Sequence, residues 1–179
     1  INLIGMNEVI RNELNFMNLQ WQMKTPQTDK SRENQDMYTG IYYQYFADKD
    51  DIDYLGYTKS DDIEKISNKL SWIAFQQQFF SSILVAENGI KNTNLTSIKE
   101  ENSDYVKNLS AEFEIDYNHN DYENIGFQFY FGPNHYKQLQ SYNKNFEEII
   151  PLGWGIFGWV NKYIIINIFD FLSRFLSNY

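Results

Sequence analysis

Carboxylates gathered in one acidic stretch are the most obvious side chains in this sequence that could do chemistry. The stretch contains Asp48, Asp50, Asp51 and Asp53, followed by Asp61 and Asp62. Carboxylates held close together can bind a cation or act as a general acid and base. Because the polar sequence around them fixes no separation between them, a solvated loop is the preferred interpretation.

Histidine and cysteine, the other usual catalytic and metal-binding residues, are scarce. The sequence holds two histidines, His119 and His135, and no cysteine. A histidine-based catalytic triad or a zinc site therefore has too few side chains to form. Glycine-rich phosphate loops and the GxSxG and HExxH motifs are absent. These observations predict a protein without catalytic residues, metal or cofactor.

One segment superficially resembles a calcium-binding loop. In DYNHNDYEN, oxygen ligands would come from Asp116, Asn118 and Asn120. Asp121 stands where such a loop needs glycine, and Phe127 stands where it needs a bidentate glutamate. The motif therefore fails, and we predict a solvated turn.

Composition favours a β-rich domain. Aromatic residues make up 18% of the 179 residues, with 14 Tyr and 14 Phe against 3 Pro, and such residues favour strands. The net charge is −9 and the basic residues form no cluster, which argues against nucleic-acid binding. Because no apolar run reaches eighteen residues and Ile1 is not an initiator methionine, we expect a soluble chain cut from a longer protein.

Apolar and polar residues alternate in several stretches, as they do in strands that bury one face. The stretches that predict strands are residues 14–23 (with a bulge), 37–45, 72–76, 79–85, 109–117 and 125–131. Polar connections are predicted at 25–35 and 47–65, and an irregular connection or edge strand at 91–105. The turn Asn88-Gly89 should close one strand pair, and the last two strands should form a hairpin. An apolar face on that hairpin needs a second sheet, so the predicted fold is mainly β, an antiparallel β-sandwich with C-terminal helices.

The chain changes character after Gly132. Pro133 ends the last predicted strand and suits the first turn of a helix. Residues 134–149 then read as helical, with apolar contacts at Tyr136, Leu139, Tyr142 and Phe146. The predicted parts are a β-sandwich at 1–132, a connecting helix at 133–150 and an amphipathic segment at 151–179.

The C-terminal segment, residues 151–179, is apolar apart from a narrow stripe. The polar residues of this stripe are Asn167, Asp170, Arg174 and Ser177. Their spacing places them on one side of a helix, and aromatic residues that favour the membrane–water boundary flank it. The predicted membrane-interface residues are Trp154, Trp159, Tyr163, Ile164, Ile165, Ile168, Phe169, Phe171, Leu172, Phe175 and Leu176. A core helix packed on the sandwich would show a similar apolar arc and is the alternative.

Three stretches, in order, resemble a known family. They are KLSWIAFQQQFFSSILVAENG, FYFGPNHYKQL and PLGWGIFGWVNKYIIINIFDFLSRFLSNY. They are similar to the central Trp-containing strand pair, the last strand with its Gly-Pro turn, and the Gly-Trp segment with its amphipathic helix in bacterial YidC-type membrane protein insertases. The resemblance is to the C-terminal part of the large periplasmic domain, in a Bacteroidetes-like form, and runs from about Trp72 to Tyr179.

This resemblance implies a β-supersandwich similar to galactose mutarotase-like domains, attached to a membrane-embedded insertase core. It implies a place on the periplasmic side of the bacterial inner membrane. The partners it implies are the membrane lipid surface, Sec translocase components and nascent membrane proteins. The family's essential arginine belongs to a transmembrane bundle that these residues do not include, and Arg174 does not correspond to it.

The leading hypothesis is a non-enzymatic fragment that serves as a scaffold or docking surface and carries a membrane-interfacial helix. The alternative is a periplasmic or secreted carbohydrate-binding β-sandwich, which would group exposed Tyr and Trp in one concavity. A sugar-converting enzyme on the same fold would need convergent carboxylates or histidines in that cleft.

Overall fold

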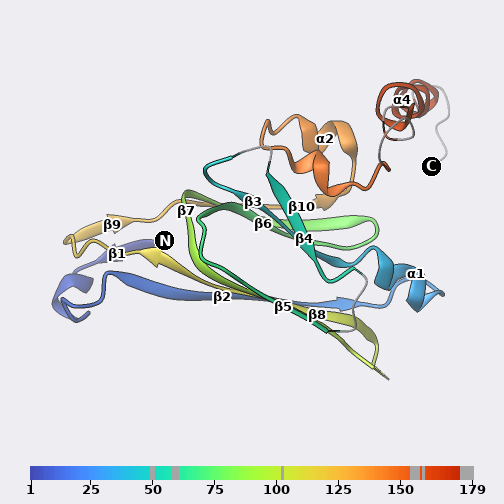
Figure 1. Ribbon diagram of the computed structural model, residues 1–179. Helices are drawn as coiled ribbons and strands as arrows, with labels where there is room; N and C mark the ends of the chain where they lie inside the picture. Colours follow the sequence, from blue (N-terminus) through green and yellow to red (C-terminus); the bar gives the residue numbers. More distant parts are fainter. Residues whose placement is uncertain (49–50, 58–60, 102, 154–157, 159, 174–179) are drawn as a thin grey trace. The chain divides into compact units, whose positions relative to one another are not determined.

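Antiparallel strands in two layers make up the first part of the molecule (Figure 1). The computed structural model describes the chain except residues 49–50, 58–60, 102, 154–157, 159 and 174–179. It divides into two compact units, Ile1–Asn134 and His135–Tyr179, and each is described by itself.

The first unit is a β-sandwich, which confirms the predicted fold class. The first layer contains, in order, β10 (Phe127–Pro133), the first half of β7 (Phe80–Lys99), β6 (Leu70–Gln76), β3 (Gly40–Tyr45) and β4 (Ile52–Leu55). The second layer contains β2 (Phe16–Pro26), β8 (Tyr105–Asp116), the second half of β7 and β5 (Asp61–Ile66). A two-stranded ribbon of β1 (Asn2–Ile4) and β9 (Tyr122–Asn124), with the 3-10 turn η1 (Met6–Glu8), completes the unit.

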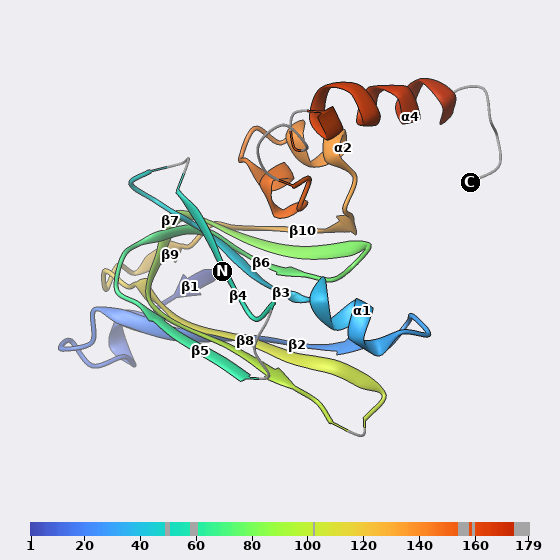
Figure 2. The ribbon, with the colours of Figure 1, turned by 45° about the vertical axis from the view of Figure 1, so that its right-hand side comes forward.

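Strand β7 belongs to both layers, and Figures 1 and 2 show it running from one to the other. Its backbone takes a positive φ at Gly89 (76°) and Asn92 (44°), and its pairing with β8 shifts register between Lys91 and Asn94. Glycine and asparagine tolerate this left-handed conformation best. The prediction that Asn88-Gly89 closes a strand pair is therefore wrong, because the turn residues bend a continuous strand. Residues 91–99, predicted as an edge or connection, are a central strand.

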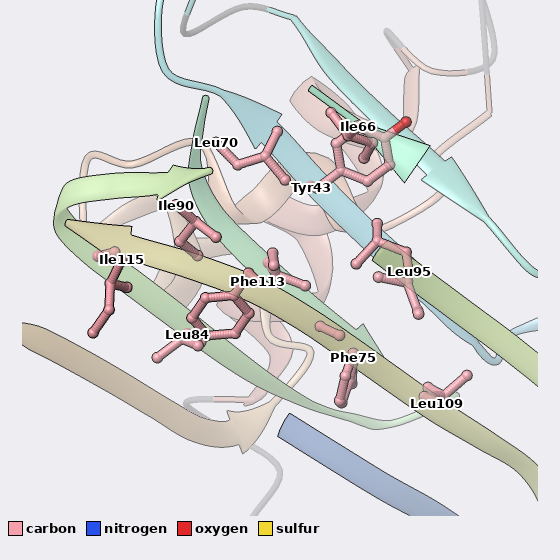
Figure 3. Close-up of a cluster of buried hydrophobic side chains, with 14 of the residues drawn as sticks. Tyr43, Ile66, Leu70, Phe75, Leu84, Ile90, Leu95, Leu109, Phe113 and Ile115 are labelled. Carbon is pink, nitrogen blue, oxygen red and sulfur yellow. The ribbon is translucent and has the colours of Figure 1, made fainter. Parts of the chain in front are cut away.

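The core lies between the layers (Figure 3). Phe75 and Leu84 reach it from the first layer, and Leu109 and Phe113 reach it from the second. The alternation predicted for residues 109–117 is confirmed. The inward residues of β8 are buried, and the side chains between them lie on the other face of the layer.

Two predicted local features at the start of the sandwich are wrong. Strand β2 carries no bulge between Phe16 and Leu19, because Met17 starts the inward face and Phe16 points away from it. Residues 37–39 are not strand, because α1 (Arg32–Met37) fills part of the predicted loop. Ser31 caps α1, its hydroxyl accepting a hydrogen bond from the backbone N–H of Asn34 at 3.2 Å.

Two predicted connections also differ from the structure. The acidic stretch at 47–65 contributes β4 and β5, which are short edge strands of the two layers. The predicted hairpin between 109–117 and 125–131 does not form, because β8 pairs with β2 and β7, whereas β10 pairs with β7 in the other layer. The inward face of residues 125–131 is nevertheless as predicted, with Ile125 in the core and Phe127 packed against it.

A buried lysine links elements that lie far apart in the sequence. The Lys107 ammonium, on an inward position of β8, donates hydrogen bonds to the backbone oxygens of Asp36, Thr39 and Gly56. It also pairs with the Asp36 carboxylate at 2.7 Å, and Lys99 pairs with the same carboxylate at 3.0 Å. Burial lowers the pKa of Lys107, and Asp36 offsets part of that effect. Burial alone would raise the pKa of Asp36, but the two lysines outweigh it and hold this pKa below its ordinary value.

The second unit contains several short helices where the sequence predicts one helix over 134–149. α2 (Tyr136–Gln140) is followed by the 3-10 turn η2 (Phe146–Ile149). Asn143 and Asn145 between them take positive φ values of 53° and 58°, which a continuous helix cannot contain. The π-helical turn η3 (Asn161–Ile165) then leads into α4 (Ile166–Ser173).

Candidate functional site

The described part of the C-terminal segment is a helix that exposes large apolar side chains. Among the predicted membrane-interface residues, those described and exposed are Tyr163, Ile164, Ile165, Ile168, Phe169, Phe171 and Leu172. Phe171 is the most exposed of them, at 60%. Trp154, Trp159, Phe175 and Leu176 lie outside the described residues. Contiguous exposed apolar side chains of this size mark an interaction surface.

The polar stripe of this helix is described in part. The Asn167 amide donates a hydrogen bond to the backbone oxygen of Tyr163 at 2.9 Å, so its polar group is satisfied within the helix. Arg174 and Ser177 lie outside the described residues. In the part of the chain that the structure describes, no helix has the length and apolar character needed to cross a bilayer.

The start of the helix is attached to the rest of the second unit by polar contacts. The Asn161 amide donates to the backbone oxygen of Leu152 at 2.7 Å. The Lys162 ammonium lies 3.6 Å from the Glu148 carboxylate and 5.7 Å from the centre of the Tyr136 ring. Contact with Tyr136 raises the pKa of Lys162, and this effect is larger than the opposing effect of burial, which lowers it. Lys162 was not among the predicted site residues, and nothing in its sequence surroundings identifies these partners.

The body of that unit is a small helical cluster in which α2 packs against η2. Their buried side chains include Tyr136, Leu139, Phe146 and Ile149, and the first three of these were predicted as apolar contacts. Tyr142, predicted to be a contact, is half exposed, although its ring lies 5.7 Å from that of Phe146. These contacts give the exposed helix a folded base.

The two histidines have local structural roles. The Nδ1 atom of His135 caps α2, accepting a hydrogen bond from the backbone N–H of Gln138 at 3.3 Å. The Nε2 atom of His119 lies 2.8 Å from the backbone oxygen of Leu14, and its ring lies 4.5 Å from that of Tyr117. Each histidine therefore makes a local contact within its own unit.

Two of the three candidate ligands in the calcium-like segment, Asp116 and Asn118, make other contacts. Asp116 pairs with Lys91 at 2.8 Å, and both the backbone N–H and the side-chain amide of Asn118 donate to the Glu123 carboxylate. Within the described residues, no group of three or more His, Cys, Asp or Glu side chains is placed to hold a metal ion. The segment is a turn closed by Glu123.

The acidic stretch is used mainly to fix the backbone. The carboxylate of Asp61 accepts from the backbone N–H of Lys99 at 3.1 Å, and that of Asp53 accepts from the backbone N–H of Tyr54 at 2.8 Å. Asp50 lies outside the described residues. These carboxylates therefore belong to strand β5 and the β4 region, as edge-strand residues.

Two cavities in the described part of the first unit lack the grouped Tyr and Trp side chains expected of a carbohydrate-binding sandwich. A cavity of about 250 Å³ near Gly89 is lined mostly by polar residues of the β9 region, and one of about 430 Å³ lies on the polar face of the second layer. Neither is lined by tryptophan. A separate cluster of tyrosines, Tyr42, Tyr54 and Tyr57, packs ring against ring at 5.3–5.5 Å, and burial raises the pKa of Tyr57.

Comparison with known proteins decides the family. A family model described as the YidC periplasmic domain matches residues 7–166. The chain belongs to the YidC periplasmic domain family. Its relatives include the membrane protein insertase YidC of Parabacteroides distasonis, which is 35% identical over 98% of the chain. Those of Bacteroides fragilis and Azobacteroides pseudotrichonymphae are 35% and 36% identical over 97% and 92% of it.

The YidC match confirms the family resemblance found in the sequence, and it extends that resemblance upstream of Trp72 to residue 7. It does not favour the carbohydrate-binding alternative. The chain spans about 28% of the length of the relatives from P. distasonis and A. pseudotrichonymphae, and 29% of that from B. fragilis.

Proposed function

We propose that this chain is a non-catalytic periplasmic part of a membrane protein insertase that assists the insertion and folding of inner-membrane proteins. Membership of the YidC periplasmic domain family supports this proposal, together with the insertase names of the relatives. The main observation behind this role is the helix of exposed apolar side chains that stands on the folded α2–η2 cluster. An exposed apolar surface of this size needs an apolar partner.

The helix over η3 and α4 lies on the outer leaflet of the inner membrane in this proposal. Its described exposed apolar side chains, at about 1 kcal/mol each for incomplete insertion, attract it to a bilayer by about 7 kcal/mol before ordering costs. Trp154, Trp159, Phe175 and Leu176 are also assigned to the membrane interface in this proposal. The contacts of Lys162 with Glu148 and Tyr136 fix the start of the helix, so that membrane binding also orients the base.

The sandwich serves in this proposal as a scaffold and docking surface. Its partners are Sec translocase components and the nascent membrane proteins handled by the full-length protein. The net charge of −9 disfavours binding to nucleic acid, which is a polyanion, and disfavours close approach to anionic lipid. Membrane attachment therefore depends on the apolar helix rather than on charge.

Flotation with phosphatidylcholine vesicles tests the membrane-interface role. The substitution Phe169→Asp places a charge on the exposed helix and should lower the partition coefficient at least about tenfold. Removal of residues 163–179 should abolish flotation. Phe79→Asp is the matched control, because Phe79 is an exposed phenylalanine at 60% in the first unit and receives the same new charge.

The control should float as the unchanged chain does, at both low and high salt. Equal flotation of the unchanged chain, the Phe169→Asp variant and the truncated chain would contradict the membrane-interface role. An equal loss for Phe79→Asp and Phe169→Asp would show that added charge, rather than the helix, controls binding.

A further inference from the structure

A π-helical turn interrupts the helix of the C-terminal segment. Gly158 and Val160 are already helical, so η3 (Asn161–Ile165) lies inside a helix that continues into α4. The backbone N–H of Ile166 donates to the backbone oxygen of Asn161, five residues earlier, where an α-helix would use the residue four earlier. Such a turn holds one residue more than an α-helical turn, and turns of this kind are frequent at functional sites. The extra residue rotates the following helix by about 100° relative to an unbroken α-helix.

One side of the helix start faces the folded base formed by α2, η2 and the segment up to Gly153. The Lys162 ammonium lies 3.6 Å from a carboxylate of η2, and the Asn161 amide donates to the backbone oxygen of Leu152 at 2.7 Å. One turn earlier, a Cβ on Gly158 would collide with the backbone oxygen of Gly153. Because residues four apart share a helix face, Gly158 and Lys162 mark the side of the helix that faces the base.

An unbroken α-helix would turn apolar side chains of α4 toward this base. One face of an α-helix recurs at alternating steps of four and three residues. Counted from Gly158 and Lys162, these steps reach Ile165, Phe169 and Leu172, all of which are large and apolar. Burial of these three side chains against the base is what a packed core helix would require.

The widened turn moves the base-facing side by one residue. Ile166 follows Lys162 on that side in place of Ile165, and it is half-buried, whereas Ile168 and Phe171 are 49% and 60% exposed. The next positions of the shifted register, 170 and 173, are occupied by polar residues in the sequence. The turn therefore directs the apolar face of α4 away from the base.

Two asparagine side chains support the widened turn. The Asn167 amide donates to the backbone oxygen of Tyr163 at 2.9 Å, so a carbonyl within η3 gains a side-chain hydrogen bond. Asn161, the first residue of η3, is held at its other side by Leu152. The turn is thus fixed to the base at its start and to α4 at its end.

We propose that η3 is a register-setting turn, which lets the apolar face of α4 lie on a bilayer while Asn161 and Lys162 hold the opposite side to the base. The role of the turn rests on the proposed membrane-interface function, whereas the register does not depend on a membrane. Removing one residue from η3 converts it to an α-helical turn and keeps the register. Adding one residue turns Ile165, Phe169 and Leu172 toward the base.

A matched pair of one-residue changes tests the role in membrane binding by flotation with phosphatidylcholine vesicles. Deletion of Ile164 removes one apolar side chain but keeps the register, so the partition coefficient should fall by at most about fivefold. Insertion of an alanine after Ile164 removes nothing but takes three apolar side chains from the membrane face, so the partition coefficient should fall at least about a hundredfold. Apolar content alone predicts the reverse order. Equal or stronger flotation of the insertion variant would overturn the proposal.

Alkylation of single cysteines by iodoacetamide tests the register without vesicles. The chain contains no cysteine, so Ile166→Cys supplies the only thiol, and Phe171→Cys supplies an exposed reference. The Ile166→Cys thiol should react at least about threefold more slowly than the reference in the unchanged and deletion chains, and at the same rate in the insertion chain. Far-UV circular dichroism checks that each variant keeps its helices.

Slow reaction of the Ile166→Cys thiol in the insertion chain, or fast reaction in the deletion chain, would overturn the register. The expected pattern of reaction in a chain that does not float would contradict the proposed membrane-interface function and leave the register standing.

Discussion

Replacement of Lys107 by methionine is the sharpest test of how the sandwich is held together. Methionine keeps most of the buried stem and removes the ammonium that bonds to Asp36, Thr39 and Gly56. Breaking a buried ion pair by removing one partner costs about 3–5 kcal/mol, because the other charge stays behind. Lys99 still pairs with Asp36 at 3.0 Å, so we expect the lower end, about 3 kcal/mol.

Urea unfolding followed by circular dichroism at pH 7 measures this loss as a lower midpoint at constant slope. Lys99→Met is the control, because it removes the other lysine from the same carboxylate. The Lys99 side chain is 32% exposed, whereas that of Lys107 is 0% exposed, so the control should cost at most about 1 kcal/mol. If Lys107→Met costs no more than Lys99→Met, the buried ammonium does not link α1 to β8 in the way described.

Three further perturbations should change stability in defined ways. As pH falls, the unfolded chain protonates Asp36 at its ordinary pKa of 3.8, before the folded chain does, because the folded pKa is lowered. The stability that this carboxylate contributes should therefore be present above pH 3.8 and be lost as pH falls through the folded pKa. Asp36→Asn should remove this acid dependence of the free energy of unfolding in urea titrations. Trp21→Ala should lower stability by about 2 kcal/mol, because the Trp21 ring stacks on Phe75 at 3.9 Å and is half-buried. Gly56→Ala should cost about 2 kcal/mol in the same assay, since φ is +92° and a new Cβ would lie 2.5 Å from the Ser97 hydroxyl.

Each of these changes has a control in the chain. Trp21→Phe keeps an aromatic ring and should lose less stability than Trp21→Ala. Gly5→Ala also meets a positive φ, of +64°, but has nothing within 4 Å of the new Cβ. It should therefore cost less than Gly56→Ala, and equal losses would show that backbone strain alone explains both. A stability difference between the unchanged chain and Asp36→Asn that stays constant from pH 5 to pH 2 would contradict the lowered pKa of Asp36.

Local pattern predicts strand faces well in this protein. Alternation identifies the inward residues of β8 and β10 because neighbouring side chains on a strand point to opposite faces. The same pattern contains a signal that was missed. Lys107 follows the alternation of Leu109 and Ala111 and so occupies an inward position, where a lysine must find buried acceptors.

The candidate site likewise combines features that the sequence pattern predicts with contacts that only the folded structure shows. Helical spacing predicts an apolar surface on the C-terminal segment, and its place at a membrane interface stays a prediction; the described side chains of α4 include the exposed Ile168, Phe169 and Phe171. Spacing does not predict the contact of Lys162 with Glu148 and Tyr136, because the folding of α2 and η2 brings those residues to the start of the helix. The break between α2 and η2 at two asparagines with positive φ also escapes a helical pattern.

The sequence by itself determined that this protein is a β-sandwich of the YidC periplasmic type with an apolar C-terminal helix. Those properties follow from residue order, periodicity and short motifs, which act over a few neighbours. Only the tertiary structure decided that β7 bends through both layers, that β8 and β10 pair in different layers, and that β1 pairs with β9. The physical reason is that alternation fixes the face of a strand but not its neighbour, and Ile1 and Ile125 pair across 124 positions of sequence.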